Sequence, residues 1–495
     1  MHLEFPLLSG GPAQGLADAG IETFEGDYAH YVVRETIQNS LDAKSDSTEV
    51  VEVTFTHQRL EKNDFPFFPD LQAALNSSRK MWGGASKEDR FFTEVDRQIT
   101  YDSFDVLRIE DFGTTGVTGD ESDDHSPWSA LVQQRGASAK STGTAAGSFG
   151  IGKDAPLAAS AFRTILYSTT TEDGKSAFQG ICRLATHLSR DGKKTQQTGF
   201  IGESYDSDLE VHPAIRNVEE IPTDFQRSSP GLSLWVLGFR YGGDSWQERF
   251  QEAAIANFWP AIHRGSLRIK IQDLTIDQTN LGSLIGSMAS NPRIKEITPY
   301  YSSEVAPDKE FHEKLPIAGK CRLTLRSEPN YPRRIKMTRK SGMIIDSYRP
   351  RGSLIPFAGH FSCISDTGNT ILRILEPPAH DKWDKDRGET KEEKKIIDEI
   401  RAWIRECIKK LNPQGHQTSF TEDQLSRHIP PISPEDLPDS GSSSGEPGIE
   451  GKPLEITLPQ VNSHRPKITV KSDGAEGEGE GDGGGGDGEE NESGE

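Results

Sequence analysis

The hydrophobic and polar positions of residues 27–43 repeat with the period of an amphipathic helix, and Asp27 is a residue type that favours a helix start. Apolar residues recur at i, i+4 and i+8, which is typical of a helix that faces a core. These residues are Val33, Ile37 and Leu41. Glu35, Asn39 and Asp42 follow at i, i+4 and i+7 on nearly the opposite face. The pattern predicts a helix that packs with one face and presents oxygen-bearing side chains on the other.

Strand and helix patterns alternate through the first 272 residues. Short runs of β-branched and apolar residues predict the strands 50–55, 106–110, 164–168, 177–184, 197–202, 232–238 and 266–271. Helices are predicted over 70–82, after Asp154 through Ala161, and over 246–262. Interleaved strands and helices indicate an α/β protein, with a two-layer α/β sandwich as the first domain.

The rest of the chain divides into three regions. Residues 273–315 are typical of a connecting region with short helices, and residues 316–411 predict a second, smaller α/β domain. Its predicted strands are 321–325, 335–338, 355–358 and 370–374, followed by a strongly periodic helix over 389–411. From residue 412 the chain is rich in Pro, Gly, Ser and acidic residues and poor in apolar ones, which predicts a disordered acidic tail over 412–495.

Composition argues against a strongly basic nucleic-acid-binding protein, a zinc protein and a disulfide-rich protein. The formal charge of the 495 residues is −21, and the last 25 residues hold ten acidic side chains against one lysine. The other 470 residues carry 55 basic and 67 acidic side chains, so no strongly basic nucleic-acid surface is expected. The four cysteines form no CxxC pair, which argues against a zinc site or a disulfide framework. No signal peptide or membrane-length apolar run is found, and we expect a cytoplasmic protein with no membrane contact.

Glu35 and Asn39 are the first candidates for chemistry. Magnesium prefers hard oxygen ligands and keeps several waters, so an amide and a carboxylate one turn apart suit a hydrated magnesium ion and an attacking water. The alternative is an ordinary solvated polar face. Asp111 is the second candidate, because it ends the strand 106–110 and precedes Gly113 and Gly116. An Asp-Gly turn is the alternative interpretation there.

The segment from Gly147 to Lys153 is the third candidate. Glycine-rich backbone that opens a helix favours phosphate, because free N–H groups and the positive helix end both attract an anion. The segment matches the start of a P-loop, but Asp154 stands where a P-loop needs Ser or Thr, and no hydrophobic strand precedes it. We therefore reject a P-loop. The polar residues 117–146 before it predict either disorder or a moving lid.

In this order, the three motifs resemble those of the GHKL superfamily, which holds DNA gyrase, the ninety-kilodalton heat-shock chaperone, histidine kinases and MutL. Asn39-Ser40-Leu41-Asp42-Ala43 is nearly the MutL motif. The third motif resembles the Gly-x-Phe-Gly-x-Gly pattern of the chaperone and the MORC ATPases. The second departs from the family, since two residues, Thr114 and Thr115, separate Gly113 from the next glycine.

The resemblance implies a Bergerat-type ATP-binding fold, with ATP and Mg²⁺ as cofactors. Glu35 would be the general base for the hydrolytic water, Asn39 the magnesium ligand, and Asp111 the acceptor of the adenine amino group. A fourth family element, Gly-Thr at the start of a late strand, is best matched by Gly231-Leu232-Ser233. The other residues expected to bind the nucleotide are Asp42, Gly113, Gly116, Gly147, Phe149, Gly150, Gly152, Lys153 and Ser233.

In gyrase and MutL, the domain after the ATPase reaches a lysine back to the terminal phosphate. Here Lys340 is the catalytic candidate, with Arg339 as the alternative, and an exposed basic turn is the plainer interpretation. His380, near Asp381 and Asp384, suits metal or acid–base chemistry, but the neighbouring prolines favour a structured turn.

The resemblance implies Mg²⁺-dependent ATP hydrolysis that drives a conformational or dimerisation switch. The closest motifs suggest a prokaryotic MORC- or MutL-like ATPase in DNA processing or phage defence, with a separate nuclease or helicase partner; DNA binding stays open. No phosphoacceptor His segment, long middle domain or nuclease motif is evident, which argues against a histidine kinase, a general chaperone and a nuclease. The alternatives are a nucleotide sensor that binds a partner without hydrolysis, and a chaperone-like ATPase.

Overall fold

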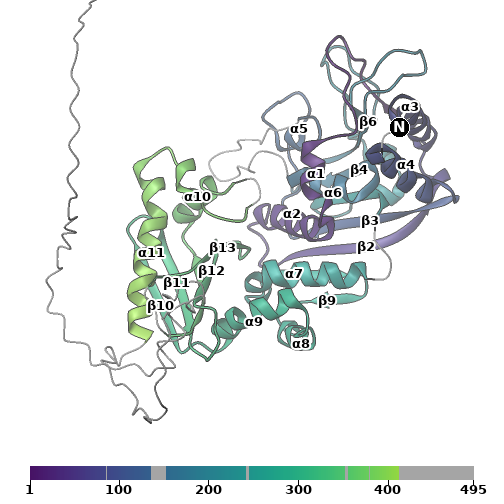
Figure 1. Ribbon diagram of the computed structural model, residues 1–495. Helices are drawn as coiled ribbons and strands as arrows, with labels where there is room; N and C mark the ends of the chain where they lie inside the picture. The colour runs from purple at the N-terminus through teal and green to yellow at the C-terminus, as the bar shows by residue number, and fades with distance from the viewer. Residues whose placement is uncertain (85, 135–151, 241–244, 352–354, 378–379, 412–495) are drawn as a thin grey trace, which may run out of the picture. The chain divides into compact units, whose positions relative to one another are not determined.

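The first part of the chain builds a large mixed β-sheet in the computed structural model (Figure 1). The structure describes residues 1–84, 86–134, 152–240, 245–351, 355–377 and 380–411. Within these residues the sheet has nine strands in the order β1-β6-β5-β4-β7-β3-β2-β8-β9, and only β2 and β8 pair in parallel. The strands are β1 (His2–Glu4), β2 (Val51–Glu61), β3 (Ser103–Phe112), β4 (Ser160–Thr170), β5 (Ser176–Arg183), β6 (Thr198–Gly202), β7 (Gly231–Phe239), β8 (Leu267–Ile271) and β9 (Leu274–Ile276).

Helices cover both faces of this sheet. One face packs against α1 (Ala19–Glu25), α2 (Tyr28–Asp42), α6 (Ala155–Ala158) and α7 (Trp246–His263). The other face packs against α3 (Phe68–Trp82) and α4 (Ser86–Ile99). Alternation along β3 serves both layers, because Leu107 and Ile109 join the first core and Phe104 and Val106 the second. The α/β class is confirmed, but α3 and α4 add a third layer to the expected two.

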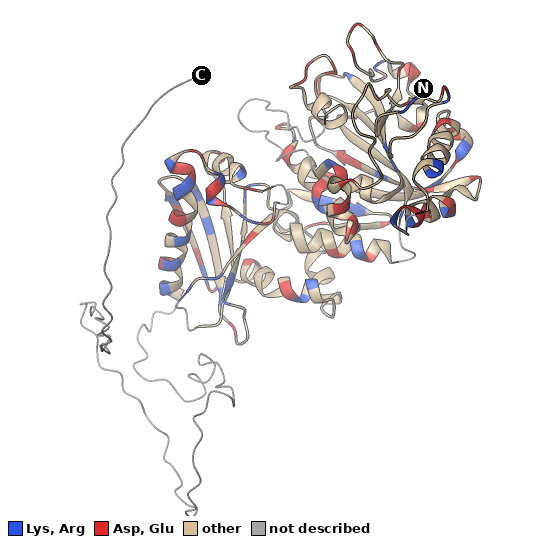
Figure 2. Ribbon diagram, turned by 45° about the horizontal axis from the view of Figure 1, so that its top comes forward, with Lys and Arg blue, Asp and Glu red and all other residues tan. Residues whose placement is uncertain are grey.

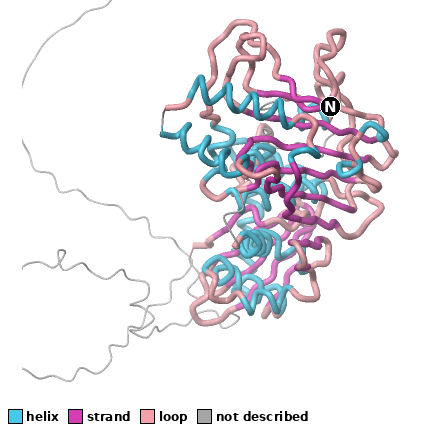
Figure 3. Tube along the Cα trace, turned by 90° about the vertical axis from the view of Figure 1, so that its right-hand side faces the viewer, coloured by secondary structure: helices cyan, strands magenta, loops and turns pink. Residues whose placement is uncertain are grey.

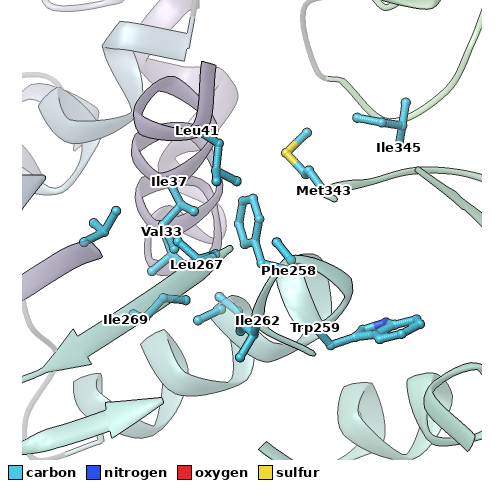
Figure 4. Close-up of a cluster of buried hydrophobic side chains, with 14 of the residues drawn as sticks. Val33, Ile37, Leu41, Phe258, Trp259, Ile262, Leu267, Ile269, Met343 and Ile345 are labelled. Atoms are coloured by element: carbon cyan, nitrogen blue, oxygen red, sulfur yellow. The ribbon is translucent and has the colours of Figure 1, made fainter. Parts of the chain in front are cut away.

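Helix α2 forms where the periodicity predicted it. The Asp27 carboxylate accepts a hydrogen bond from the His30 N–H and caps the first turn. The apolar stripe of α2 packs against α7 and β8, as Figure 4 shows. The side chains that meet there include Val33, Ile37, Leu41, Phe258, Ile262, Leu267 and Ile269. The stripe therefore fixes which face of α2 is left for other contacts.

A second mixed sheet follows, with the order β10-β11-β14-β12-β13 and a parallel pairing between β12 and β14. Its strands are β10 (Lys309–Leu315), β11 (Gly319–Arg326), β12 (Arg334–Thr338), β13 (Ile344–Tyr348) and β14 (Ala358–Cys363). Helix α9 (Pro292–Val305) packs on one face, where Glu304 bonds to His360 and Thr324. Helix α11 (Lys391–Leu411) packs on the other, where the Phe361 ring meets Trp403.

Shorter elements complete the described chain. Figure 3 shows the helices and loops that lie beside the strands. The shorter elements are the helices α5 (Pro127–Val132), α8 (Leu281–Ser287) and α10 (Asp366–Ile374), and the 3-10 turns η1 (Lys62–Asp64), η2 (Gly152–Asp154), η3 (Val218–Glu220), η4 (Thr223–Phe225) and η5 (Lys385–Arg387). Among the described helices, none joins the length and the apolar composition needed to cross a bilayer.

Several predicted elements need correction. Residues 370–374, expected as a strand, belong to helix α10, because Gly368, Leu372 and Leu375 are buried at helical spacing. The strand expected at 355–358 is β14, which starts only at Ala358. The helix expected up to Ala161 ends at Ala158, and β4 begins at Ser160. The expected lid contains helix α5, and residues 135–146 lie outside the described residues.

The connecting region also carries more structure than expected. Residues 273–315 include β9, α8, α9 and β10, and β10 is an edge strand of the second sheet. One hydrophobic core continues from the first sheet to the second sheet and α11. Charged residues occur along the whole length of α11 in Figure 2, whereas its buried residues are apolar at the predicted spacing. The predicted tail, 412–495, lies outside the described residues.

Phe258 tests this shared core, because its ring is fully buried between α2 and α7. Phe258→Ala should lower the free energy of unfolding by about 3–5 kcal/mol, since it leaves a cavity in a packed interior. Val305→Ala removes a side chain that is 53% exposed and should stay within about 0.5 kcal/mol of wild type. Urea denaturation measures both, and equal stabilities of the two variants would contradict the packing.

Candidate functional site

A cavity of about 470 Å³, including its open mouth, lies where α2, β3, β7 and the start of α6 meet. Its lining unites residues from all three sequence motifs. The polar members are Glu35, Thr36, Asn39, Ser40, Asp111 and Lys153. The apolar members are Ile109, Leu131, Pro156, Leu232 and Leu234. Gly152 and Tyr167 complete the lining. Residues that are more than a hundred positions apart in the sequence thus share one chamber.

Helix α2 presents Glu35 and Asn39 to this cavity on successive turns. The Glu35 carboxylate is buried, and the described residues provide it with no hydrogen-bond donor. Gly152 faces it so closely that a Cβ atom at this position would collide with the carboxylate oxygen. Asn39 is exposed at the cavity. Its amide oxygen is a suitable hard ligand for magnesium, and the waters and phosphates of a ligand would supply the rest.

The environment of Glu35 favours its protonated form. Burial raises the pKa of the Glu35 carboxyl, while the charges of His380 and Arg34 act in the opposite direction. A carboxylate with a raised pKa is a better proton acceptor, which is what a general base needs. Glu35 therefore has the position and the basicity to activate a water molecule in the cavity.

Asp111 is a buried carboxylate that is held by three donors. Its Oδ1 accepts the Leu232 N–H over 2.8 Å and the Thr114 hydroxyl over 2.7 Å. Its Oδ2 lies 3.1 Å from the Ser40 hydroxyl, which also bonds to the Thr36 carbonyl. Burial raises the pKa of Asp111, and the hydrogen bonds from Thr114 and Leu232 oppose this rise. The result is a fixed acceptor on the cavity wall.

Apolar side chains form the walls around Asp111. Ile109 and the pair Leu232 and Leu234 come from neighbouring strands and give the cavity one apolar wall, which suits the face of a flat ring. Tyr167 also lines the cavity, and its buried hydroxyl has no partner among the described residues. Burial raises the pKa of this hydroxyl, so it stays protonated. A buried hydroxyl without a partner is costly unless a ligand or water satisfies it.

The glycine-rich segment is described only from Gly152. Gly147, Phe149 and Gly150 lie outside the described residues. Lys153 lines the cavity, and its ammonium group donates to the carbonyl of Ala130 over 2.7 Å and to that of Gln134. This lysine therefore ties the end of α5 to the cavity.

Other predicted residues lie outside the cavity lining. Gly113 and Gly116 have positive φ angles of 74° and 73° and shape the turn after β3. Ser233 faces the opposite side of β7, where its hydroxyl bonds to Glu110 and Arg227. Leu232, one residue earlier, occupies the place on the cavity wall. The segment expected to match a Gly-Thr element thus contributes the Leu232 side chain to the cavity wall and the Leu232 N–H as a donor to Asp111.

The remaining predicted residues face the second sheet. The Asp42 carboxylate lies 3.0 Å from the Arg373 guanidinium, and Lys340 is exposed and pairs with Asp366 at 2.6 Å. Arg339 is buried and bonds to Glu376. In this state neither Arg339 nor Lys340 reaches the cavity. His380 is buried against Glu376, in agreement with the structural turn that the prolines favoured.

Sequence reasoning missed Ser40, Thr114 and Tyr167. Ser40 lies inside the first motif and Thr114 directly after Gly113, so their proximity to Asp111 could have suggested them. Tyr167 gives no such signal, because its contact with the cavity depends on which strands pair.

In comparisons with known proteins, no protein-family model matches the chain, and no curated protein sequence matches it. Within the described residues no group of three His, Cys, Asp or Glu side chains could hold a metal ion by itself. A magnesium ion at Asn39 would depend on ligand oxygens.

The pKa of Glu35 leads to a pH-dependent stability. Since it is raised above the ordinary value of 4.5, the folded protein binds more protons than the unfolded chain in the interval between the two pKa values. Stability therefore falls as pH rises through this interval. Glu35→Gln removes the ionisable group, so it should raise the unfolding temperature at about pH 8 and lose this advantage towards pH 4.5.

Thermal unfolding at several pH values measures this effect. Glu49→Gln replaces an exposed carboxylate just after α2 and should leave the unfolding temperature unchanged at every pH. A gain from Glu35→Gln that is the same at pH 4.5 and pH 8 would show that ionisation of Glu35 is not its cause.

Proposed function

We propose that this chain binds ATP with Mg²⁺ and hydrolyses it. The observation that supports this most is the convergence of Glu35, Asn39, Asp111 and Lys153 on one cavity. A buried acceptor, a buried base and a carboxamide beside an apolar wall are the groups that adenine, an attacking water and a hydrated cation need. We infer a GHKL-type ATP-binding fold from these residues and their motifs.

Asp111 would select the base. Its carboxylate is fixed by the Leu232 N–H and the Thr114 hydroxyl, so it can accept the exocyclic amino group of adenine without rearranging. Guanine presents a carbonyl oxygen at the equivalent edge, and two acceptors repel each other. Ile109 and Leu234, which are paired across two strands, would contact one face of the ring.

Glu35 would act on the water. The carboxylate accepts a proton as the water oxygen forms a bond to the terminal phosphorus, and the bond to the bridging oxygen of ADP breaks. The products are ADP and inorganic phosphate. Lack of a Cβ atom at Gly152 leaves room beside the carboxylate, and Asn39 would hold the magnesium ion, which neutralises phosphate charge.

Nucleotide turnover would work as a switch. We propose that ATP binding promotes dimerisation and that hydrolysis resets it, with the second α/β unit as the transducing part. A DNA-processing or phage-defence role with a separate nuclease or helicase partner rests on the motif resemblance alone. We assign no phosphate contact to Lys340 or Arg339, because both are held by carboxylates of the second unit.

Asp111→Asn tests base recognition. The amide nitrogen cannot accept the adenine amino group, and it faces existing donors. Loss of one charge-assisted hydrogen bond costs about 1.5–3 kcal/mol, so the Kd for ATP should rise at least about tenfold. Glu110→Gln changes the neighbouring carboxylate on the other face of β3 and should leave the Kd unchanged. Calorimetric titration measures both, and an unchanged Kd for Asp111→Asn would remove Asp111 from the site.

Glu35→Ala and Asn39→Ala separate binding from chemistry. Glu35→Ala should still bind ATP, because adenine and phosphate contacts persist, while kcat falls roughly 10²–10⁴-fold. Asn39→Ala should lose the magnesium-dependent part of ATP affinity together with turnover.

Phosphate release and equilibrium binding, each with and without Mg²⁺, provide the data. Wild-type turnover in the Glu35 variant would refute the role of Glu35 as base. Tight ATP binding by a wild-type protein that releases no phosphate would instead support the nucleotide sensor.

A further inference from the structure

The second α/β unit, which is the sheet β10–β14 with α10 and α11, contacts helix α2 next to the candidate base Glu35. Arg34 precedes Glu35 and is buried. Its guanidinium donates to the Asn257 carboxamide over 2.5 Å, to the Ile344 carbonyl over 3.3 Å and to the carbonyl of His380. Ile344 begins β13 and His380 follows α10, so two segments of the second unit grip one side chain of α2.

A second grip lies at the last turn of α2. The Asp42 carboxylate is 3.0 Å from the Arg373 guanidinium of α10 and 3.9 Å from the Arg339 guanidinium that follows β12. The side chain of Asp42 is 17% exposed, so water screens these pairs only in part. The helix is thus fixed at two points that lie eight residues apart.

Glu376 joins the two grips into one network. It is fully buried, accepts the Arg339 Nε–H over 2.5 Å and lies 2.8 Å from the His380 ring. The Trp383 indole N–H also donates to it, over 3.2 Å. A buried carboxylate with this many partners moves little without breaking several hydrogen bonds at once. Displacement of the 339–343 turn or of α10 would therefore be transmitted to the middle of α2 at Arg34 and to its last turn at Asp42.

The two grips enclose the catalytic candidates. Glu35 follows Arg34 directly, and Asn39 lies three residues before Asp42. Both candidates sit on the helical segment between the grips, so a shift of the second unit would reach them through these contacts as well as through the shared hydrophobic core. Asp111, by contrast, lies on β3, and two of its three donors, the Leu232 N–H and the Thr114 hydroxyl, lie outside α2, whereas Ser40 of α2 supplies the third.

We propose that this clamp, formed by Arg34 with Ile344 and His380 and by Asp42 with Arg339 and Arg373, lets the second unit control turnover by positioning Glu35 and Asn39. The proposal rests on the proposed ATPase function. The clamp residues are positioning residues, because they hold α2 in place and do not line the cavity. They are Arg34 and Asp42 on α2 and Arg339 and Arg373 in the second unit. Base recognition at Asp111 would depend on the clamp only through the Ser40 hydroxyl, because the Leu232 and Thr114 donors lie outside α2.

The test uses the partly exposed grip, where variants are least likely to unfold the protein. Arg373→Gln and Asp42→Asn each remove the charge pair, Arg373→Lys keeps the charge, and Lys336→Gln removes a pair with Glu296 away from α2. Amide hydrogen exchange of the full chain without nucleotide reports on α2 directly. ATP affinity and kcat report on the site.

With the clamp broken, exchange at the amides of residues 40–43 should speed up by roughly tenfold. The kcat should fall roughly 10–100-fold, as expected for small misplacement of catalytic groups, while the Kd for ATP changes less than about threefold. The double variant Asp42→Asn/Arg373→Gln should be no worse than either single one. Arg373→Lys should recover part of kcat, and Lys336→Gln should match wild type.

Unchanged exchange and kcat in folded Arg373→Gln and Asp42→Asn proteins would overturn the clamp. So would an equal loss of ATP affinity and kcat, which would indicate general damage to the site. If wild-type protein neither binds nor hydrolyses ATP, the proposed function fails. The exchange at residues 40–43 then still decides whether the second unit holds α2.

Discussion

Helix α2 buries charged side chains on the same turns that carry its apolar stripe. The residues around α2 must therefore supply partners or cavities for these charges. A buried charge without partners costs several kcal/mol, so Arg34 and Glu35 each need a specific environment. Arg34 finds a carboxamide and two carbonyls, most of them from beyond residue 340. Glu35 instead faces a cavity beside Gly152, and its pKa rises. Packing of α2 thus ties the candidate site to the second sheet.

The two carboxylates of the cavity, Asp111 and Glu35, differ in their hydrogen bonding. Asp111 is surrounded by Thr114, Ser40 and the Leu232 amide, which fix its direction and make it a stationary acceptor. Glu35 has no donor among the described residues and is free to exchange a proton with a water molecule. Under the proposed function, this difference in hydrogen bonding suits Asp111 to recognition and Glu35 to acid–base chemistry.

Elements with strong periodicity were mostly predicted correctly from the sequence. Elements whose type or bounds depend on tertiary contacts were predicted less well. The stripes of α2, α7 and α11 are long and regular, so their positions follow from local pattern. Helix α10 was mistaken for a strand because Thr370-Ile371-Leu372 is typical of β-structure, and only packing of Gly368 and Leu372 reveals the helix. Strand β10 is charged and exposed at a sheet edge, where alternation gives little signal.

The same division holds for the site. The motif resemblance implied that Glu35, Asn39 and Asp111 contact one nucleotide, and all three line the same cavity. Ser233 was predicted to face the cavity, and this prediction was wrong. Side chains alternate along β7, so the preceding residue, Leu232, lines the cavity and Ser233 faces away. Which basic residue of the 339–343 turn would face α2 depends on burial, and this was not visible in the sequence.

Hydrogen exchange upon nucleotide addition tests the central claim most directly, because it locates binding without assuming catalysis. With Mg²⁺ and ATP, amides of α2, of residues 111–116 and of residues 152–158 should become protected, while α3 and α4 on the opposite face of the sheet stay unchanged. GTP at the same concentration should protect none of these segments. Protection by ATP and GTP alike, or protection confined to other segments, would contradict an adenine site built around Asp111 and α2.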